Sequence, residues 1–225
     1  DMSKPASGPM ALLKKLRGGG KDPKDKPATG GAAQMKMLRR LPQILRFIPG
    51  TAQDMRAYFL VLQYWLAGSE QNMVNLVQFL VDRYADGARR GLRGTLKPGV
   101  PLEYPEVGIY HPRMPGRLAE DTAALPRVAT SGKNGTVGLL MLRSYLLAGN
   151  TAHYDGVITA LEARGLRVVP AFATGLDARP AVEKFFFDGT RGIVDAVVSL
   201  TGFSLVGGPA YNDARAAEDI LARLD

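Results

Sequence analysis

The chain has 225 residues, a formal net charge of +8 and no cysteine. This length suits one or two domains with a hydrophobic core, and the lack of cysteine excludes disulfides, cysteine-ligated zinc and iron–sulfur clusters. No stretch approaches the roughly 20 apolar residues that a membrane-spanning helix needs, and no secretory signal is visible. We therefore expect a soluble protein without a transmembrane segment.

The positive charge is concentrated in residues 1–47, which hold eleven Lys and Arg residues and three acidic residues. Such a segment suits contacts with nucleic acid, an anionic membrane surface or an acidic partner subunit. Glycine and proline interrupt the charges, and no aromatic residues alternate with them, which argues against a nucleic-acid platform. We interpret residues 1–33 as a basic flexible linker, with a peripheral membrane contact as the alternative.

Residues 34–92 form a predicted helical region, because apolar residues recur at spacings of three and four. Pro49-Gly50 ends the first run, Thr51 is a favourable N-cap for the second, and Gly68-Ser69 separates the second from the third. We interpret the apolar stripes as core, with a cofactor face made from their aromatic residues as the alternative. The stripes are Met37, Leu38, Leu41, Ile44, Leu45 and Ile48; Met55, Tyr58, Phe59, Leu62 and Trp65; and Met73, Leu76, Val77, Leu80 and Tyr84.

Residues 93–135 contain six prolines and almost no periodicity. Loops of this length in compact proteins are functional or connect larger parts. We expect an extended Pro-rich connection that wraps around a larger body.

Strands and helices alternate in residues 136–225, which predicts an α/β fold containing part of a doubly wound parallel sheet with right-handed crossovers. Pro170 lacks an N–H group, so we expect its strand at a sheet edge or with a bulge. Three parallel strands leave open edges, so we expect a fragment of a larger multidomain protein. The predicted strands are Val137–Leu142, Leu166–Ala173 and Ala196–Leu200, and the predicted helices cover residues 151–165, 180–187 and 213–224.

Ligands of open α/β sheets bind beyond the carboxyl ends of the strands. Arg guanidinium groups pair with carboxylates, an exposed Phe can lie against an aromatic ring, and His relays protons near neutral pH. Each residue also has a structural alternative, as a solvated side chain, a backbone hydrogen-bond partner or a core residue. The candidates at this edge are Arg143, Ser144, His153, Thr201, Phe203 and Ser204, and His111 in the Pro-rich connection is a further candidate.

Metal and nucleotide motifs are missing from the sequence. Two histidines without clustered acidic residues do not predict a metal site. The glycine-rich run from Gly202 to Gly208 is not followed by Gly-Lys-Ser/Thr, so it is not a phosphate-binding P-loop, and no G-x-G-x-x-G follows a strand. The residues alone therefore predict a ligand edge without naming a reaction.

Four stretches of the sequence form one group: Ser7–Leu16, Met37–Pro42 with Arg46–Asp54, Tyr64–Ser69, and Ser199–Phe203 with Val206–Ala210. They resemble the large, porphyrin-binding subunit of magnesium chelatase, in the cobaltochelatase and magnesium chelatase family. A fifth stretch, His153-Tyr154 with Leu161–Gly165, is similar both to that subunit and to the cobalt-inserting subunit of cobaltochelatase. The first two stretches favour the magnesium enzyme.

The resemblance implies a subunit that binds protoporphyrin IX and hosts insertion of Mg²⁺ in bacteriochlorophyll or chlorophyll biosynthesis. It also implies two AAA-type ATPase partner subunits that hydrolyse ATP, in the bacterial cytoplasm or the plastid stroma. We expect the essential carboxylates beyond Asp225, and His153 is the one catalytic candidate that the resemblance transfers. The alternatives are a cobaltochelatase subunit that inserts cobalt in cobalamin biosynthesis, and a scaffold segment that docks the ATPase subunits through its basic start.

Overall fold

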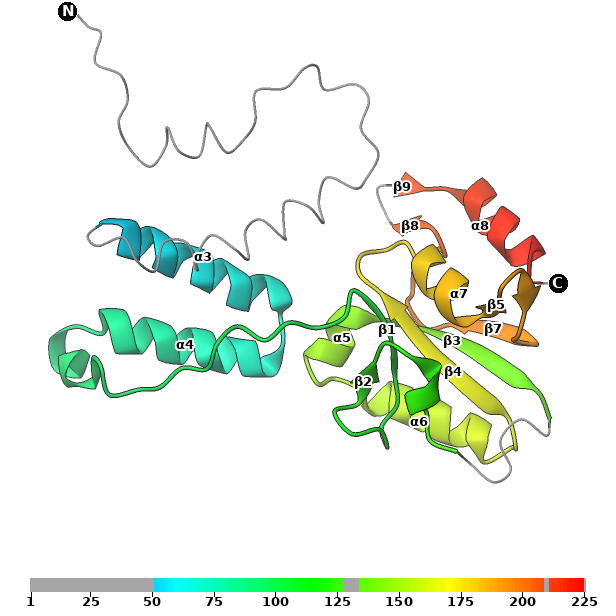
Figure 1. Cartoon of the computed structure of the whole chain (residues 1–225), viewed down its shortest axis with the longest axis horizontal. Coiled ribbons are helices and arrows are strands. Elements are labelled where there is room, and N and C mark those ends of the chain that lie inside the picture. Colours follow the sequence, from blue (N-terminus) through cyan, green and yellow to red (C-terminus); the bar gives the residue numbers. More distant parts are fainter. Residues whose placement is uncertain (1–50, 128–133, 209–210, 225) are drawn as a thin grey trace, which may run out of the picture. The chain divides into compact units, whose positions relative to one another are not determined.

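A computed structural model describes residues 51–127, 134–208 and 211–224 (Figure 1). The chain divides into two compact units: the described residues of the first are 51–66 and 75–101, and those of the second are 67–74 and 102–224 except for the two gaps. The predicted basic linker, residues 1–33, and the first predicted apolar stripe, residues 37–48, lie outside the described residues.

Two helices, α3 (Thr51–Ala67) and α4 (Glu70–Tyr84), occupy the second and third predicted helical runs, and Thr51 is the first residue of α3. Gly68 adopts a φ of +61°, the left-handed conformation that ends helices. The backbone N–H of Asn72 donates to the Ser69 hydroxyl at 3.1 Å, so Ser69 caps α4 as predicted. A short 3₁₀ helix, η1 (Gly87–Leu92), follows α4.

Residues 96–105, between η1 and the sheet, form an extended segment. Side chains of α3 and α4 bind the part of it that belongs to the first unit. The backbone N–H of Leu96 donates to Asp82 at 2.8 Å, that of Gly99 donates to Asn75, and the Tyr64 hydroxyl donates to the Gly99 carbonyl. In the second unit, the Asn72 side chain bonds both backbone groups of Leu102, at 2.8 and 2.9 Å. Polar side chains therefore satisfy the backbone of a segment that has no strand partner.

The apolar stripes of α3 and α4 are only partly core. Phe59 is buried as predicted. The prediction of a core position is wrong for five other stripe residues, which are exposed: Tyr58 and Trp65 on α3, and Val77, Leu80 and Tyr84 on α4. The reason is that α4 turns Asn75 and its polar neighbours toward the extended segment, which leaves part of its apolar stripe outside.

The second unit is built on a five-stranded mixed sheet with the order β2-β1-β4-β3-β7. The three predicted strands are present and parallel, which confirms the α/β fold class: β3 (Thr136–Leu142), β4 (Arg167–Ala173) and β7 (Ala196–Ser199). The Pro-rich segment adds two antiparallel strands that the sequence did not predict, β1 (Val107–Tyr110) and β2 (Leu118–Ala119).

The remaining elements connect and cover this sheet. The helices are α5 (Arg143–Leu147), α6 (Ala152–Glu162), α7 (Arg179–Phe185), α8 (Ala214–Ala222) and the 3₁₀ turn η2 (Thr122–Ala124). Two small hairpins pair β5 (Phe187–Asp188) with β6 (Arg191–Gly192) and β8 (Gly207–Gly208) with β9 (Tyr211–Asn212).

Helices cover both faces of the sheet, as a doubly wound fold requires (Figure 1). On one face, Tyr154 and Ile158 of α6 pack with Leu139 of β3 and its neighbours. On the other face, Val182 of α7 and Ile220 of α8 belong to the cluster that contains Leu140. Adjacent residues of β3 therefore face opposite layers, which explains why its sequence is a continuous apolar run.

Pro170 lies on a central strand, so the prediction of an edge position is wrong. It pairs with Leu139 on the β3 side, and on the other side the register of β1 with β4 ends at Ile109 and Ala171. The backbone N–H of Thr174 donates to the Glu106 carbonyl oxygen at 2.7 Å. Every second residue of β4 turns its backbone N toward β1, so the N of Pro170 also faces β1. Because the pairing of β4 with β1 ends at Ala171, the missing N–H of Pro170 lies one residue beyond it and breaks no hydrogen bond between the two strands.

Candidate functional site

The carboxyl ends of β3, β4 and β7 form a topological switch point. The chain passes from β3 through α6 to β4 on one side, then crosses back through α7 to place β7 on the other side of β3. Loops that leave neighbouring strands toward opposite faces open a crevice, and ligands of α/β proteins bind there.

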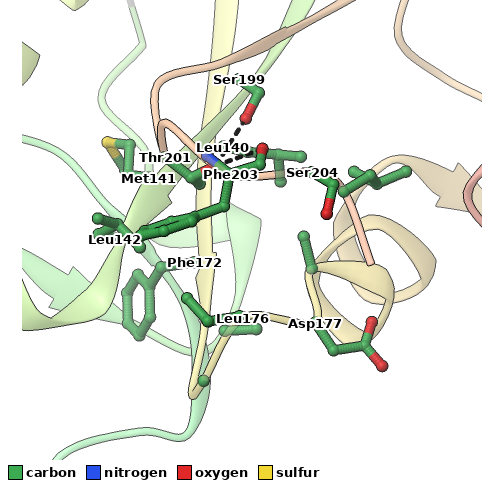
Figure 2. A pocket seen from close by; sticks show the side chains of 14 residues that line it. Leu140, Met141, Leu142, Phe172, Leu176, Asp177, Ser199, Thr201, Phe203 and Ser204 are labelled. Carbon is green, nitrogen blue, oxygen red and sulfur yellow. Dashed lines mark hydrogen bonds between the residues drawn. The ribbon is translucent and has the colours of Figure 1, made fainter. Parts of the chain in front are cut away.

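A small pocket lies at this position (Figure 2). Its enclosed volume is ≈ 20 Å³, room for about one water molecule. The lining combines apolar strand ends with hydroxyl groups and one carboxylate. The lining residues are Leu140, Met141, Leu142, Phe172, Ala173, Gly175, Leu176, Asp177, Ala178, Ser199, Thr201, Phe203, Ser204 and Leu205.

The turn after β7 presents Phe203 at the pocket. The Thr201 hydroxyl accepts a hydrogen bond from the backbone N–H of Phe203 at 3.2 Å and lies 3.0 Å from the Ser199 hydroxyl. Gly202 between them has a φ of +73°, which favours glycine. The Phe203 ring extends toward Leu142 and stays 39% exposed (Figure 2). The turn thus fixes an aromatic face at the pocket without burying it.

Asp177 is the carboxylate of the pocket. Arg179 donates to it from Nε at 3.0 and 3.1 Å, from Nη2 at 2.7 Å and from its backbone N–H at 3.0 Å. Partial burial works to raise the pKa of Asp177, but the Arg179 hydrogen bonds and charge outweigh it and hold the pKa below its ordinary value. Asp177 is therefore an ionised, neutralised group and a weak base. Sequence reasoning missed it, although its place just after a predicted strand was a usable signal.

Among the sequence candidates, Thr201, Phe203 and Ser204 line this pocket together, and Arg143 and Ser144 do not. The Arg143 guanidinium donates from Nε to the Pro105 carbonyl at 2.7 Å and from Nη2 to the Tyr104 carbonyl at 3.1 Å. Ser144 is exposed in the first turn of α5. Arg143 therefore fastens the extended segment that leads into β1.

The two histidines lie apart from the pocket lining. His153 is exposed in the first turn of α6, with its ring centroid 3.9 Å from that of Tyr154 and 5.6 Å from that of Tyr145. It joins exposed Tyr145 of α5 and buried Tyr154 of α6 in an aromatic cluster. The structure therefore gives His153 solvent access but no place beside Phe203.

His111 is 1% exposed and belongs to a buried polar cluster. Its Nδ1 accepts from the backbone N–H of Arg113 at 3.1 Å, so Nε2 carries the proton and donates to Glu162 at 3.1 Å. The Arg113 guanidinium donates to the other Glu162 oxygen at 2.8 Å. Both ring nitrogens of His111 are therefore hydrogen-bonded, and they help to join the turn after β1 to α6. This arrangement indicates a structural role for His111.

Residues 51–127, 134–208 and 211–224 contain neither a metal-binding cluster nor a helix that could span a membrane. No group of three or more His, Cys, Asp or Glu side chains is placed there to hold a metal ion. No helix among these residues is long and apolar enough to cross a membrane. The described chemistry of the site is therefore an exposed aromatic ring, three hydroxyl groups and a paired carboxylate.

Comparison with known proteins gives matches along the whole chain. The H subunit of magnesium chelatase from Rhodobacter capsulatus is 58% identical over 226 residues, and that from Cereibacter sphaeroides is 56% identical over 225 residues. In both cases the match covers 100% of this chain and 18% of the relative. The chloroplastic ChlH subunit of magnesium chelatase from Oryza sativa subsp. indica is 36% identical over 217 residues, covering 90% of this chain and 15% of the relative.

Two family models match adjacent parts of the sequence. A domain of unknown function (DUF3479) matches residues 1–59, and the CobN/Magnesium Chelatase model matches residues 62–225, which include the whole sheet and the pocket. The second match covers well over half of the chain, and this chain therefore belongs to the CobN/magnesium chelatase family.

Proposed function

We propose that this chain is a segment of the large, porphyrin-binding subunit of magnesium chelatase, which inserts Mg²⁺ into protoporphyrin IX for bacteriochlorophyll or chlorophyll biosynthesis. The observation that carries the proposal is the 58% identity, over the whole chain, with a magnesium-chelatase H subunit. The chain spans 18% of the length of that relative. The activity therefore belongs to a larger assembly, in which this chain supplies part of the binding surface.

The pocket geometry supports a role in binding the macrocycle. A cavity of ≈ 20 Å³ cannot enclose a tetrapyrrole, so the ring would lie across its mouth. Phe203 offers an exposed aromatic face there, and an offset-stacked pair of aromatic rings contributes about 0.5–1.5 kcal/mol beyond area burial. Ser204, whose hydroxyl donates to the Val206 carbonyl at 3.4 Å, lines the same pocket and adds a polar group to it.

The insertion step needs groups that this pocket lacks. Two pyrrole N–H groups must lose their protons, and Mg²⁺, which gives up its water reluctantly, must be partly dehydrated. Asp177 is a weak base because Arg179 neutralises it and lowers its pKa. In this proposal the chain forms a wall of the porphyrin site, proton acceptance and metal handling lie outside the described residues, and ATP is hydrolysed by two AAA-type partner subunits. The compartment is the cytoplasm in a bacterium.

Two alternative functions remain for this chain. The family model names both CobN and magnesium chelatase, so insertion of cobalt into a cobalamin precursor is the second candidate function. Docking of the ATPase subunits through the basic start, including Lys14, Lys15 and Arg17, is the third, and these residues lie outside the described part of the chain.

The experiment is a binding and insertion assay on the full-length subunit that contains this sequence. Protoporphyrin IX is titrated and followed by its absorbance band and by quenching of protein fluorescence, and hydrogenobyrinic acid diamide serves as the competing tetrapyrrole. Binding of protoporphyrin IX, with Mg²⁺ insertion once ATP and the partner subunits are added, is expected. Failure to bind protoporphyrin IX would refute the proposal, and binding of the other tetrapyrrole with cobalt insertion would establish the second candidate.

A further inference from the structure

We infer that the second unit binds a small organic carboxylate with an apolar body, in a cavity separate from the pocket beside Phe203. We call this site the Arg117 cavity. Its volume is ≈ 240 Å³, all of its lining residues belong to the second unit, and none of them lines the Phe203 pocket. The inference does not depend on the proposed porphyrin site.

The backbone of Arg117 has an unusual conformation beside this cavity. Its φ of +60° is the one positive φ at a residue other than glycine in residues 51–127, 134–208 and 211–224. The turn holds it there, because the Arg117 N–H donates to the Met114 carbonyl and the Arg117 carbonyl accepts from the His111 N–H, both at 3.0 Å. Glycine adopts this conformation at less cost. A strained arginine at a cavity therefore indicates that its guanidinium has a use.

A hydrogen-bond network orients the Arg117 guanidinium. Its Nη1 donates to Thr151 Oγ1 at 3.3 Å, and the Thr151 hydroxyl donates to Asp155 at 3.2 Å. The Tyr110 hydroxyl donates to the other Asp155 oxygen at 2.5 Å, and burial together with this bond raises the pKa of Tyr110. A guanidinium has five N–H donors, and Arg117 makes no second hydrogen bond or ion pair with the residues that the structure describes. Donors therefore remain for a ligand.

The walls of the Arg117 cavity suit an apolar body. Leu146 and Leu147 of α5 line it together with Leu118 of β2 and Tyr104. The Tyr104 carbonyl accepts from the Arg143 guanidinium at 3.1 Å, which fixes the backbone of this aromatic wall. An apolar cavity of about 150 Å³ holds benzene. A cavity of ≈ 240 Å³ therefore has room for a ring of that size and a carboxylate.

The charges of the lining favour a carboxylate. The guanidinium fork matches the two oxygens of a carboxylate, and the N-terminal end of α6 at Thr151 adds partial positive charge. Glu70 is the acidic residue of the lining, but it is exposed, so water and salt screen its charge. Phosphate could pair with Arg117 as well, but it has no apolar body and would leave the leucine and tyrosine walls without contact.

The test uses 4-fluorobenzoate as the probe and the full-length subunit that contains this sequence. Binding is followed by broadening of the fluorine NMR line of the probe, and 4-fluorobenzamide serves as the uncharged probe of the same shape. We expect the benzoate to bind roughly tenfold more tightly than the benzamide, since hydrogen bonds to charged groups contribute about 1.5–3 kcal/mol. Equal binding of the two probes, or no broadening by millimolar benzoate, would overturn the inference.

Two variants locate the binding site. Arg117→Gly should weaken benzoate binding roughly tenfold, whereas Arg191→Gln, which removes an exposed arginine outside the cavity, should not change it. Glycine suits the φ of +60°, so hydrogen exchange of the turn around Arg117 should be as slow in Arg117→Gly as in the wild type. Unchanged benzoate affinity in Arg117→Gly would refute the site. Displacement of the benzoate by protoporphyrin IX would show that the cavity takes a carboxylate arm of that ring and not a separate acid.

Discussion

Replacement of Gly138 by alanine tests the packing that positions the pocket. An added Cβ at Gly138 in β3 would lie 2.6 Å from Cε2 and Cζ of Phe186 and 2.9 Å from its Cδ2. Ordinary contacts between such carbons are about 3.5–4.0 Å, so the overlap approaches 1 Å. Phe186 is fully buried in the core cluster that contains Val182 of α7 and Leu140 of β3, so its ring cannot move away without disturbing that packing. We expect Gly138→Ala to lower the free energy of unfolding by about 1–3 kcal/mol, as overpacked cores do.

The assay is urea unfolding followed by far-UV circular dichroism, with Gly156→Ala as the matched control. Gly156 is exposed in α6, and a Cβ there meets nothing within 4 Å. That control should raise the free energy of unfolding by about 0.5–1 kcal/mol, because glycine weakens a helix interior. Phe186→Leu should recover part of the loss only in the Gly138→Ala background. If Gly138→Ala is as stable as Gly156→Ala, the close packing of Phe186 on β3 is refuted.

Two further predictions concern charged groups of the second unit. Arg143→Lys should lower the free energy of unfolding by about 1–2 kcal/mol, because a lysine lacks the planar guanidinium fork that reaches the Pro105 and Tyr104 carbonyls from two nitrogens. A loss below about 0.3 kcal/mol in urea unfolding would contradict this. Asp177→Asn should destabilise the chain slightly at pH 7, since the pKa of Asp177 is lower in the folded than in the unfolded state. The stabilisation by ionised Asp177 is present above the ordinary carboxyl pKa of about 4 and is lost as the pH falls through the lower pKa of the folded state. The stability difference between wild type and Asp177→Asn should therefore vanish in acid and shrink in high salt. A difference that is independent of pH from 7 to 2 would show that Arg179 does not hold the carboxylate.

The sequence predicted the elements whose signals are local. The cap at Ser69, the helix end at Gly68 and the three parallel strands all follow from residue type and spacing. The continuous apolar run of β3 indicated a strand covered on both faces, and α6 and α7 supply those covers.

The sequence did not predict features that depend on distant partners. Val107–Tyr110 is too short and too close to prolines to read as a strand, and it becomes β1 only because β4 offers a free edge. Pro170 suggested an edge strand because nothing local shows that β1 pairing stops one residue earlier. The exposure of Trp65 likewise depends on which side of α3 the extended segment occupies.

The sequence predicted the location of the pocket better than it predicted which residues line it. The alternation of strands and helices predicted a ligand edge at the carboxyl ends of the parallel strands, and in the structure Thr201 and Phe203 line a pocket there. Arg143 instead bonds backbone carbonyls, and His111 is enclosed by Glu162 and Arg113, contacts between residues far apart in sequence. Asp177 also lines the pocket, and its place just after the strand Leu166–Ala173 was a signal that the sequence analysis did not use.

The most direct test of the central proposal compares Phe203→Ala with Tyr211→Ala in the full-length subunit that contains this sequence. Both are exposed aromatic residues, at 39% and 66%, but Phe203 lines the pocket and Tyr211 does not. The measurement is the steady-state rate of Mg²⁺ insertion at varied protoporphyrin IX, with ATP and the partner subunits present. Loss of stacking of about 1 kcal/mol predicts a KM raised roughly fivefold for Phe203→Ala with kcat little changed, and no change for Tyr211→Ala. Identical KM values for the wild type and both variants would contradict a porphyrin site at this edge of the sheet.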